Sequence, residues 1–277
     1  MNLEDIFYAK FDETKRSLDL DNPKTLNDKL VWLSLYDDMN YLKPICADKI
    51  KVRDYAKEKI GKDICVPLLK VYDSPNDIVL SELPNKFVLK TNNGYNQNLI
   101  CTDKSKLNEN EVRKTFATYL RNPHGIKSCE LHYLFIKRKC FAEKLLERDD
   151  KQPISQTDYK FFCFNGEPKL MHMVLDYHTP KQRMHHYDMN GKFRPDIDRN
   201  GFNVRLDLQK QDRLPKNFDL MKEYARKLAA PFRFVRVDFY EVNGKVYLGE
   251  MTFTPAAFGM KFKNPNTDRM LGDMLKL

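Results

Sequence analysis

Three of the five Asn-Gly dipeptides in this chain, those at 165–166, 190–191 and 243–244, most strongly constrain its fold. Each lies between short runs rich in aromatic and β-branched residues, and Asn-Gly in that setting favours a tight two-residue hairpin. The pairs predict hairpins over 158–177, around 185–193 and over 233–253. Helical patterns separate these hairpins without a regular β-α-β order. The sequence therefore predicts an α+β protein.

The rest of the chain carries the patterns of several helices and of further strands. The first 60 residues look helical, and the last helix expected there ends at Gly61, a common helix stop. Asn108 is placed to cap a later helix. We expect helices over 26–38, 47–61, 107–120, 217–229 and 268–277, strands over 65–74 and 139–147, a helical turn over 74–84, and a strand, a polar loop and a strand over 86–103.

Length and composition exclude several classes of protein. The chain has 277 residues, of which 42% are hydrophobic and 31% charged, so it suffices for about two folding units with a core. No apolar run approaches the ~18 residues that span a bilayer, and the charged N-terminus is unlike a signal peptide. We therefore expect a soluble cytoplasmic protein.

The net charge of +9, from 48 Lys+Arg and 39 Asp+Glu, has two interpretations. It is either a solvated lysine-rich surface or a preference for an anionic partner such as a nucleotide or an acidic polysaccharide. No zinc-finger, basic-zipper or RNA-recognition pattern accompanies the charge, so we expect no nucleic-acid partner.

Cysteine and histidine residues give no metal motif. The six cysteines form no C-x-x-C pair, and we expect them to be reduced and buried. His185 and His186 are expected at the surface or in a substrate groove. Together with His172, His178 and Arg183 they are candidates for an acceptor groove, and ordinary hairpin surface residues are the alternative.

The hairpin over 233–253 is the most informative stretch. Alternation along its first strand places Arg236, Asp238 and Tyr240 on one face, and along its second strand it places Glu250 and Thr252 on one face. Two carboxylates side by side repel each other unless a cation lies between them. Mg²⁺ takes oxygen ligands and is commonly shared with nucleotide phosphates. The alternative is a pair of solvated carboxylates.

Two further strand ends carry candidate nucleotide-binding groups. Lys90 closes an apolar strand before a polar loop, a placement that suits phosphate binding, although the chain has no Walker motif. Glu143 and Lys144 follow another apolar strand, whose exposed main chain could bond a base edge. Taken singly, Lys90 is more typical of a surface lysine before a hairpin turn, and Glu143 and Lys144 are more typical of an ordinary strand end with charged flanks.

The order of these motifs resembles the ATP-grasp superfamily, and in detail its TupA-like branch, which is linked with teichuronopeptide and capsular polysaccharide synthesis. The resemblance extends from about residue 28 to the C-terminus. Its most specific segments are DYKFFCFNGEP and VRVDFY followed by GE, TF and P. The other matching segments are DKIKVRDYAKEKIG, VPLLKVYDS, LPNKFVLKTNNG, NLICTDKSKL, AEKLLE and LGDMLKL.

The resemblance implies an ATP-grasp fold, in which two α+β lobes clasp ATP. It implies a helical N-terminal segment over 1–60, a small lobe over 61–140 and a large lobe over 141–277 that carries the metal-binding hairpin. The residues implied to bind the nucleotide are Lys49 and Lys90 at the phosphates or the adenine side, Glu143, Lys144 and Leu146 at the adenine, and Glu147 at the ribose.

The resemblance also implies roles around the phosphates. Asp238 and Glu250 would hold Mg²⁺, Arg236 would stabilise the transferred phosphoryl group, and Lys160 would lie near the γ-phosphate. Many relatives have Asn where this chain has Thr252, which puts a second metal site in doubt. The loop 91–98 also departs from the family pattern, because it carries a bulky tyrosine, Tyr95, where a small residue is usual.

The activity that the resemblance implies is an ATP-dependent carboxylate–amine ligase that forms an amide through an acylphosphate. Its partners would be ATP, Mg²⁺, an anionic saccharide or uronic-acid acceptor, and an amine or amino acid. The alternatives are a sugar kinase that uses the same ATP site, a binding module with a decayed site, and a glycosyltransferase. Only the letters Asp196-Ile197-Asp198 support a nucleotide-sugar site. The sequence predicts no oligomeric state.

Overall fold

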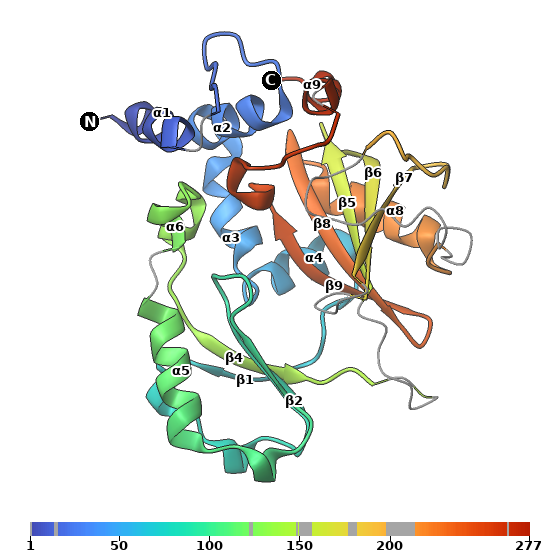
Figure 1. Ribbon diagram of the computed structural model, residues 1–277. Helices are drawn as coiled ribbons and strands as arrows, with labels where there is room; N and C mark the ends of the chain where they lie inside the picture. The colour runs from blue at the N-terminus through green and yellow to red at the C-terminus, as the bar shows by residue number, and fades with distance from the viewer. Residues whose placement is uncertain are drawn as a thin grey trace.

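The computed structural model describes residues 2–13, 16–121, 124–147, 149, 157–176, 182–197, 214–264 and 266–277. Within these ranges, helices and two antiparallel sheets form two lobes, with helices α3 and α4 near the junction (Figure 1). The predicted α+β class is confirmed.

The smaller lobe is built on a four-stranded sheet in the order β1-β4-β2-β3. Alternation along its strands separates two faces: Phe87 and Leu89 join a hydrophobic core with Phe116, whereas Lys90 and Glu143 belong to the opposite face. Helix α5 lies against the core face (Figure 1). The strands are β1 (Leu68–Tyr72), β2 (Phe87–Thr91), β3 (Asn98–Cys101) and β4 (Cys140–Lys144), and the helices are α5 (Glu109–Arg121), η2 (Pro75–Asp77), η3 (Leu80–Glu82) and η4 (Lys104–Lys106).

The larger lobe is built on a five-stranded sheet in the order β7-β6-β5-β8-β9. Helix α8 (Phe218–Ala229) covers one face of this sheet (Figure 1). On the other face, Phe162, Phe164 and Phe234 pack at one end of the sheet with residues of α1, α2 and α9. The strands are β5 (Asp158–Phe164), β6 (Glu167–Leu175), β7 (Arg183–Asp188), β8 (Phe234–Val242) and β9 (Lys245–Thr252).

Two of the three Asn-Gly pairs form the predicted hairpin turns. Asn165 and Gly166 join β5 to β6, Asn243 and Gly244 join β8 to β9, and all four residues have positive φ, as a type I′ turn requires. The pair at 190–191 differs, because only Gly191 has positive φ. The chain turns back there through a single bridge between Tyr187 and Phe193 rather than through a second strand.

In the helical N-terminal segment, the helix predicted before Gly61 is shorter than its sequence pattern indicates. The helix expected over 47–61 begins at Val52, and Lys49 lies in the turn before it, while Gly61 ends it with a φ of 83° as expected. Asn108 caps α5 as predicted, accepting bonds from the amides of Asn110 and Glu111. The remaining helices are α1 (Leu3–Glu13), α2 (Leu26–Tyr36), η1 (Asp38–Tyr41), α3 (Lys43–Ala47), α4 (Val52–Ile60), α6 (His124–Lys127), η5 (Leu131–Phe135), η6 (Pro255–Phe258) and α9 (Asn266–Asp273).

The predicted division at residues 140 and 141 falls at the start of β4. All of Cys140–Lys144 pairs with β1 and β2, so the four-stranded sheet extends to Lys144.

All six cysteines are buried and free, which confirms that expectation: Cys46, Cys65, Cys101, Cys129, Cys140 and Cys163. No helix in the described part of the chain is long and apolar enough to cross a membrane.

The histidines of the middle hairpins are not at the surface. His172, His185 and His186 are each at most 1% exposed, so the surface interpretation is wrong for them. The ring of His172 lies between Phe162 and His186, at centroid distances of 4.1 and 4.0 Å. Arg183 is half-buried and pairs with Asp176, and His178 lies outside the described residues.

A buried charge cluster anchors the N-terminal segment to the larger sheet. The carboxylate of Asp37, just after α2, pairs with Lys43 at 2.9 Å and with Arg233, next to the start of β8, at 2.9 Å. Beside this cluster His132, on the 3-10 helix η5, is only 6% exposed. Burial lowers the pKa of His132 to about 3, and the charge of Lys43 acts in the same direction.

The burial of His132 predicts a loss of stability in acid. Because the pKa in the unfolded chain is near 6.5, that state binds more protons between pH 6.5 and 3, and the free energy of unfolding falls as the pH drops through this window. In His132→Phe this contribution is absent, so wild type should lose about 1.4 kcal/mol more than the variant per pH unit. Urea unfolding at pH 6.5, 5.5 and 4.5 measures the difference. Parallel pH profiles would contradict the prediction.

Candidate active site

One row of five side chains crosses the larger sheet. Glu250 is the direct partner of Asp238, Asp238 of Lys160, Lys160 of His172 and His172 of His186. Directly opposed residues of antiparallel strands share a face, so all five belong to the same face of the sheet. The predicted juxtaposition of Asp238 and Glu250 is confirmed. His172 and His186 extend the row on the other side of Lys160, onto β6 and β7.

The carboxylate of Asp238 is held by two cations. Arg236 donates from Nε to Oδ1 and from Nη2 to Oδ2, both at 2.7 Å, and Lys160 Nζ lies 2.7 Å from Oδ2. Asp238 is only 2% exposed, and a carboxylate buried to this extent is costly unless it is paired. Arg236 also reaches Oε1 of Glu250 at 2.8 Å, so one guanidinium joins both acids.

Glu250 is the more exposed of the two acids and faces the smaller lobe. Its Oε2 lies 3.8 Å from Lys49 Nζ, and Lys49 also donates to the carbonyl of Gly94 at 2.6 Å. Burial alone would raise the pKa of Glu250, but the charges of Lys49, Arg236 and Lys160 outweigh it and lower the pKa to about 2. Glu250 is therefore ionised at neutral pH, as a metal ligand must be.

These donors suit one divalent ion that also binds a nucleotide. In the described ranges no group of three or more His, Cys, Asp or Glu side chains could hold a metal. Asp238 and Glu250 would supply two carboxylates, and Mg²⁺ ordinarily completes its shell with phosphate oxygens and water. The hydroxyl of Thr252 donates to Glu250 at 3.2 Å and accepts from Arg236 at 3.0 Å, so Thr252 supports the acid.

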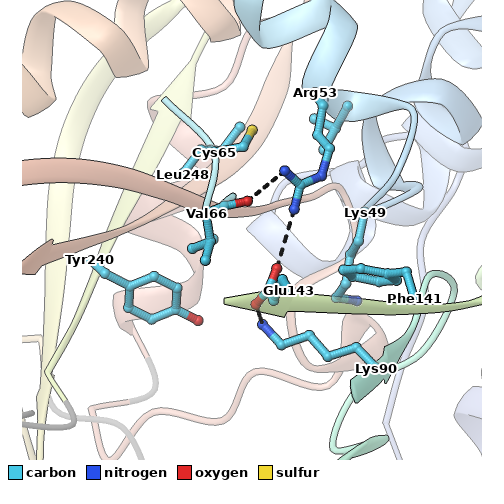
Figure 2. Close-up of a pocket in the computed structure, with 11 residues that line it drawn as sticks. Lys49, Arg53, Cys65, Val66, Lys90, Phe141, Glu143, Tyr240 and Leu248 are labelled. Carbon is cyan, nitrogen blue, oxygen red and sulfur yellow. Dashed lines mark hydrogen bonds and ion pairs between the residues drawn. The ribbon is translucent and has the colours of Figure 1, made fainter. Parts of the chain in front are cut away.

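A cleft between the two lobes lies beside this cluster. Figure 2 shows Glu143 at the end of β4 between Arg53 and Lys90, with the ring of Tyr240 on the opposite side. The lining combines charged side chains with apolar and aromatic surface, which is typical of small-molecule sites. The lining residues are Lys49, Val52, Arg53, Cys65, Val66, Lys90, Phe141, Glu143, Tyr240, Leu248 and Gly249.

Three of the residues implied to bind nucleotide, namely Lys49, Lys90 and Glu143, meet in this cleft. Lys144 is exposed, and its backbone amide donates to the carbonyl of Pro67 at 2.9 Å. Leu146 is half-buried, and Glu147 is exposed and pairs with Lys86 at 2.6 Å. The roles expected for Lys144, Leu146 and Glu147 stay predictions.

Sequence reasoning missed Arg53, which organises the cleft. From α4 it donates to the carbonyl of Val66 at 2.6 Å and pairs with Glu143 at 3.2 Å, while Lys90 binds the other oxygen of the same carboxylate. Glu143 is thus bridged by two cations from different elements. The sequence held no signal for this contact, because the partners are 90 and 53 residues away.

Side-chain hydrogen bonds hold the loop 91–98 to the segment before β4 and close it on itself. The amide side chain of Asn92 donates to the carbonyl of Lys137 at 3.0 Å and accepts from the amide of Lys139 at 2.8 Å. Thr91 donates to Gln97 at 2.6 Å. The unusual Tyr95 is 67% exposed, so its bulk is accommodated outside the packed part of the loop.

The nucleotide-sugar motif gains no support from the structure. Asp196 accepts two bonds from its neighbour Arg194, at 2.8 and 2.6 Å, and Ile197 is fully buried. Asp198 lies outside the described residues.

Comparison with known proteins decides the family. Residues 28–276 match the TupA-like ATP-grasp family, which is most of the chain. The chain belongs to this family. The ATP-grasp fold predicted from the sequence is therefore confirmed for this TupA-like protein. No curated protein matches its sequence.

Solved ATP-grasp structures are similar to this TupA-like chain at low identity. D-alanine–D-alanine ligase from Bacillus anthracis, complexed with ATP, has 13% identity over 76% of this chain and 55% of its own, with a TM-score of 0.43. The ATP-grasp ligase PsnB, complexed with a precursor variant, Mg and ADP, has 11% identity over 86% and 60%, with a TM-score of 0.46. PurK in its ADP complex has 15% identity over 91% and 57%, with a TM-score of 0.44. The chain thus spans less than two thirds of each of these proteins.

Gly249 gives the site a steric test. It is the extra residue of a bulge in β9, opposite Asp238 and Phe239, and a Cβ there would lie 2.9 Å from Cε2 of Tyr240 and 3.3 Å from the carbonyl of Asp238. Gly249→Ala should therefore lower the free energy of unfolding by about 1–3 kcal/mol. In a Tyr240→Ala background most of this cost should vanish, and urea unfolding of the four proteins measures the coupling. Additive effects would contradict the clash.

Proposed function

We propose that this protein is an ATP-dependent carboxylate–amine ligase. The observation that carries the proposal is the cluster of Asp238, Glu250, Arg236 and Lys160 on one sheet face, next to a cleft that contains Lys49, Lys90 and Glu143. Two acids for a metal, surrounded by cations, suit the transfer of a phosphoryl group, because that reaction needs positioning and charge neutralisation rather than a protein nucleophile.

The proposed position of ATP follows the direction of β8. The adenine would occupy the cleft beside Tyr240, between the four-stranded lobe and the five-stranded lobe, and the phosphates would extend toward Asp238 and Glu250. Lys90 would contact the phosphates from the smaller lobe, and Lys49 would contact them from the turn before α4. Mg²⁺, when bound by the two acids, would neutralise phosphate charge and orient the triphosphate. Lys160 and Arg236 would then face the γ-phosphoryl group.

The proposed reaction has two steps. An oxygen of the substrate carboxylate attacks the γ-phosphorus, the bond to the β-phosphate oxygen breaks, and ADP leaves. The amine then attacks the acyl carbon of the acylphosphate and the C–O bond to phosphorus breaks. The proton lost by the amine leaves with the phosphate, so the products are an amide and HPO₄²⁻. Arg236 is placed to stabilise charge in the first step, because it already binds both acids.

We infer that the carboxylate belongs to an anionic saccharide, such as a uronic acid of a capsular or teichuronic-type polysaccharide. The family assignment and the net charge of +9 support this inference. Six buried, free cysteines fit a reducing compartment such as the cytoplasm.

Nucleotide binding tests the metal cluster. Titration calorimetry should detect ADP binding that requires Mg²⁺, and Asp238→Asn should weaken it at least tenfold, because the ion loses one of its two carboxylates. Asp196→Asn is the matched control, since Asp196 is also an arginine-bound aspartate but lies outside the cluster. Equal affinity in wild type and Asp238→Asn would refute the proposed site.

Hydroxylamine distinguishes a ligase from a kinase. With ATP, Mg²⁺ and a galacturonate oligosaccharide, a ligase should release ADP and form a hydroxamate, because hydroxylamine intercepts the acylphosphate. Lys160→Met should reduce both products by at least tenfold. ADP release with a stable phosphorylated sugar and no hydroxamate would instead identify a kinase.

A further inference from the structure

Strand β8 connects the nucleotide cleft to a second cavity. Phe234, Arg236, Asp238 and Tyr240 alternate along this strand and so share one face, and successive members lie about 7 Å apart. Tyr240 lines the nucleotide cleft, whereas Phe234 lines the second cavity. The second cavity therefore begins one such step beyond Arg236, on the side away from the nucleotide cleft.

The second cavity is roomy and mostly apolar. Its volume is about 220 Å³, and leucines of α1 and α2 form much of its wall together with Phe135 of η5, Phe234 of β8 and Phe253 just after β9. Leu3 and Phe135 are 52% and 75% exposed. Apolar side chains left in water at a cavity lining are typical of a surface that binds an apolar group.

The charged group of this cavity is already satisfied. Lys43 Nζ binds Asp37 at 2.9 Å, Asn40 at 2.7 Å and the carbonyl of Leu33 at 2.9 Å, which uses all three of its donors. The hydroxyl of Thr254 donates to Glu130. Because a buried carboxylate without a partner is costly, the cavity disfavours a ligand that carries one.

His132 lines the cavity and is 6% exposed. Its Nε2 is a buried atom that has no hydrogen bond among the described residues. The lowered pKa of His132 keeps the imidazole neutral at physiological pH. In the tautomer that carries its proton on Nδ1, the neutral ring can accept a hydrogen bond at Nε2 from an uncharged ligand.

We propose that this cavity binds the amine substrate, as an uncharged primary amine with an aliphatic or aromatic body and no carboxylate. The inference rests on the proposed ligase function, since the second step requires an amine with a free lone pair. An apolar cavity favours that neutral form. The apolar body fills the space between α2 and η5, and an N–H of the amine donates to His132 Nε2.

In this arrangement the two substrates of the second step approach from opposite sides of Arg236. The amine lone pair attacks the acyl carbon, the C–O bond to phosphorus breaks, and the amine proton leaves with the phosphate as HPO₄²⁻. His132 is a positioning residue that directs the amine. Of the two classes of second substrate, an amine without a carboxylate and a zwitterionic amino acid, the cavity therefore favours the amine without a carboxylate.

Binding of benzylamine, measured by calorimetry at pH 8.5 on the full chain, tests the inference. We expect saturable binding at least tenfold tighter than that of L-phenylalanine, which has the same ring but adds a carboxylate. Phe135→Ala should weaken benzylamine binding at least threefold. Leu134→Ala is the matched control: Leu134 lies beside Phe135 on η5 and is 44% exposed, but it does not line the cavity. Both sites are at the surface, so folding is retained, which thermal unfolding verifies.

His132→Phe, compared with His132→Gln, tests the hydrogen bond. The first variant should lose benzylamine binding and the second should keep part of it, because glutamine retains an acceptor. ADP and Mg²⁺ are titrated into the same wild-type protein. Suppose that ADP and Mg²⁺ bind. The inference about the amine is then overturned by any of three results: benzylamine does not bind, L-phenylalanine binds as tightly as benzylamine, or Leu134→Ala weakens benzylamine binding as much as Phe135→Ala does. In each of these cases the proposed ligase function stands. Absence of ADP binding would instead remove the proposed function.

Discussion

The pairing of one buried aspartate with two cations holds the active-site face together. Asp238 lies between Lys160 on β5 and Glu250 on β9, and its carboxylate is satisfied by Arg236 and Lys160 at 2.7 Å. Without these partners, burial of a carboxylate at 2% exposure would oppose folding of the central strands. The same two cations offset the negative charge of both acids from within the protein itself.

Strand β8 orders the chemistry along one line. Its alternate residues pass from the cleft between the lobes at Tyr240, through Asp238 and Arg236, to the apolar cavity at Phe234. Along a strand, residues two positions apart are separated by about 7 Å, and the hydrogen bonds to neighbouring strands hold this spacing fixed. The sheet therefore sets the distance between a phosphate-binding group and its neighbours more exactly than a loop would.

The sequence predicted those parts of the molecule that depend on local chemistry. Asn243-Gly244 fixed the register of β8 and β9 from Val242 back to Phe239. That register alone would set Asp238 opposite Gly249, and it is the bulge at Gly249, which no sequence pattern predicted, that brings Glu250 opposite Asp238. The helical pattern around Lys49 extended too far, because the Asp48 carboxylate binds the amide of Ile50 in a turn before α4. The bridge from Arg53 to Glu143 and the burial of the hairpin histidines depend on contacts between distant segments. No local pattern encodes such contacts, so they became visible only in the folded chain.

Residues 64–67 join the two sheets within a very short stretch. The carbonyl of Ile64 accepts from the amide of Leu248 on β9 at 2.7 Å, and the carbonyl of Pro67 accepts from the amide of Lys144 at the end of β4 at 2.9 Å. Proline restricts the backbone between these two attachments. Consequently the lobes are fastened together at one edge, where they cannot separate or slide past each other without breaking main-chain hydrogen bonds.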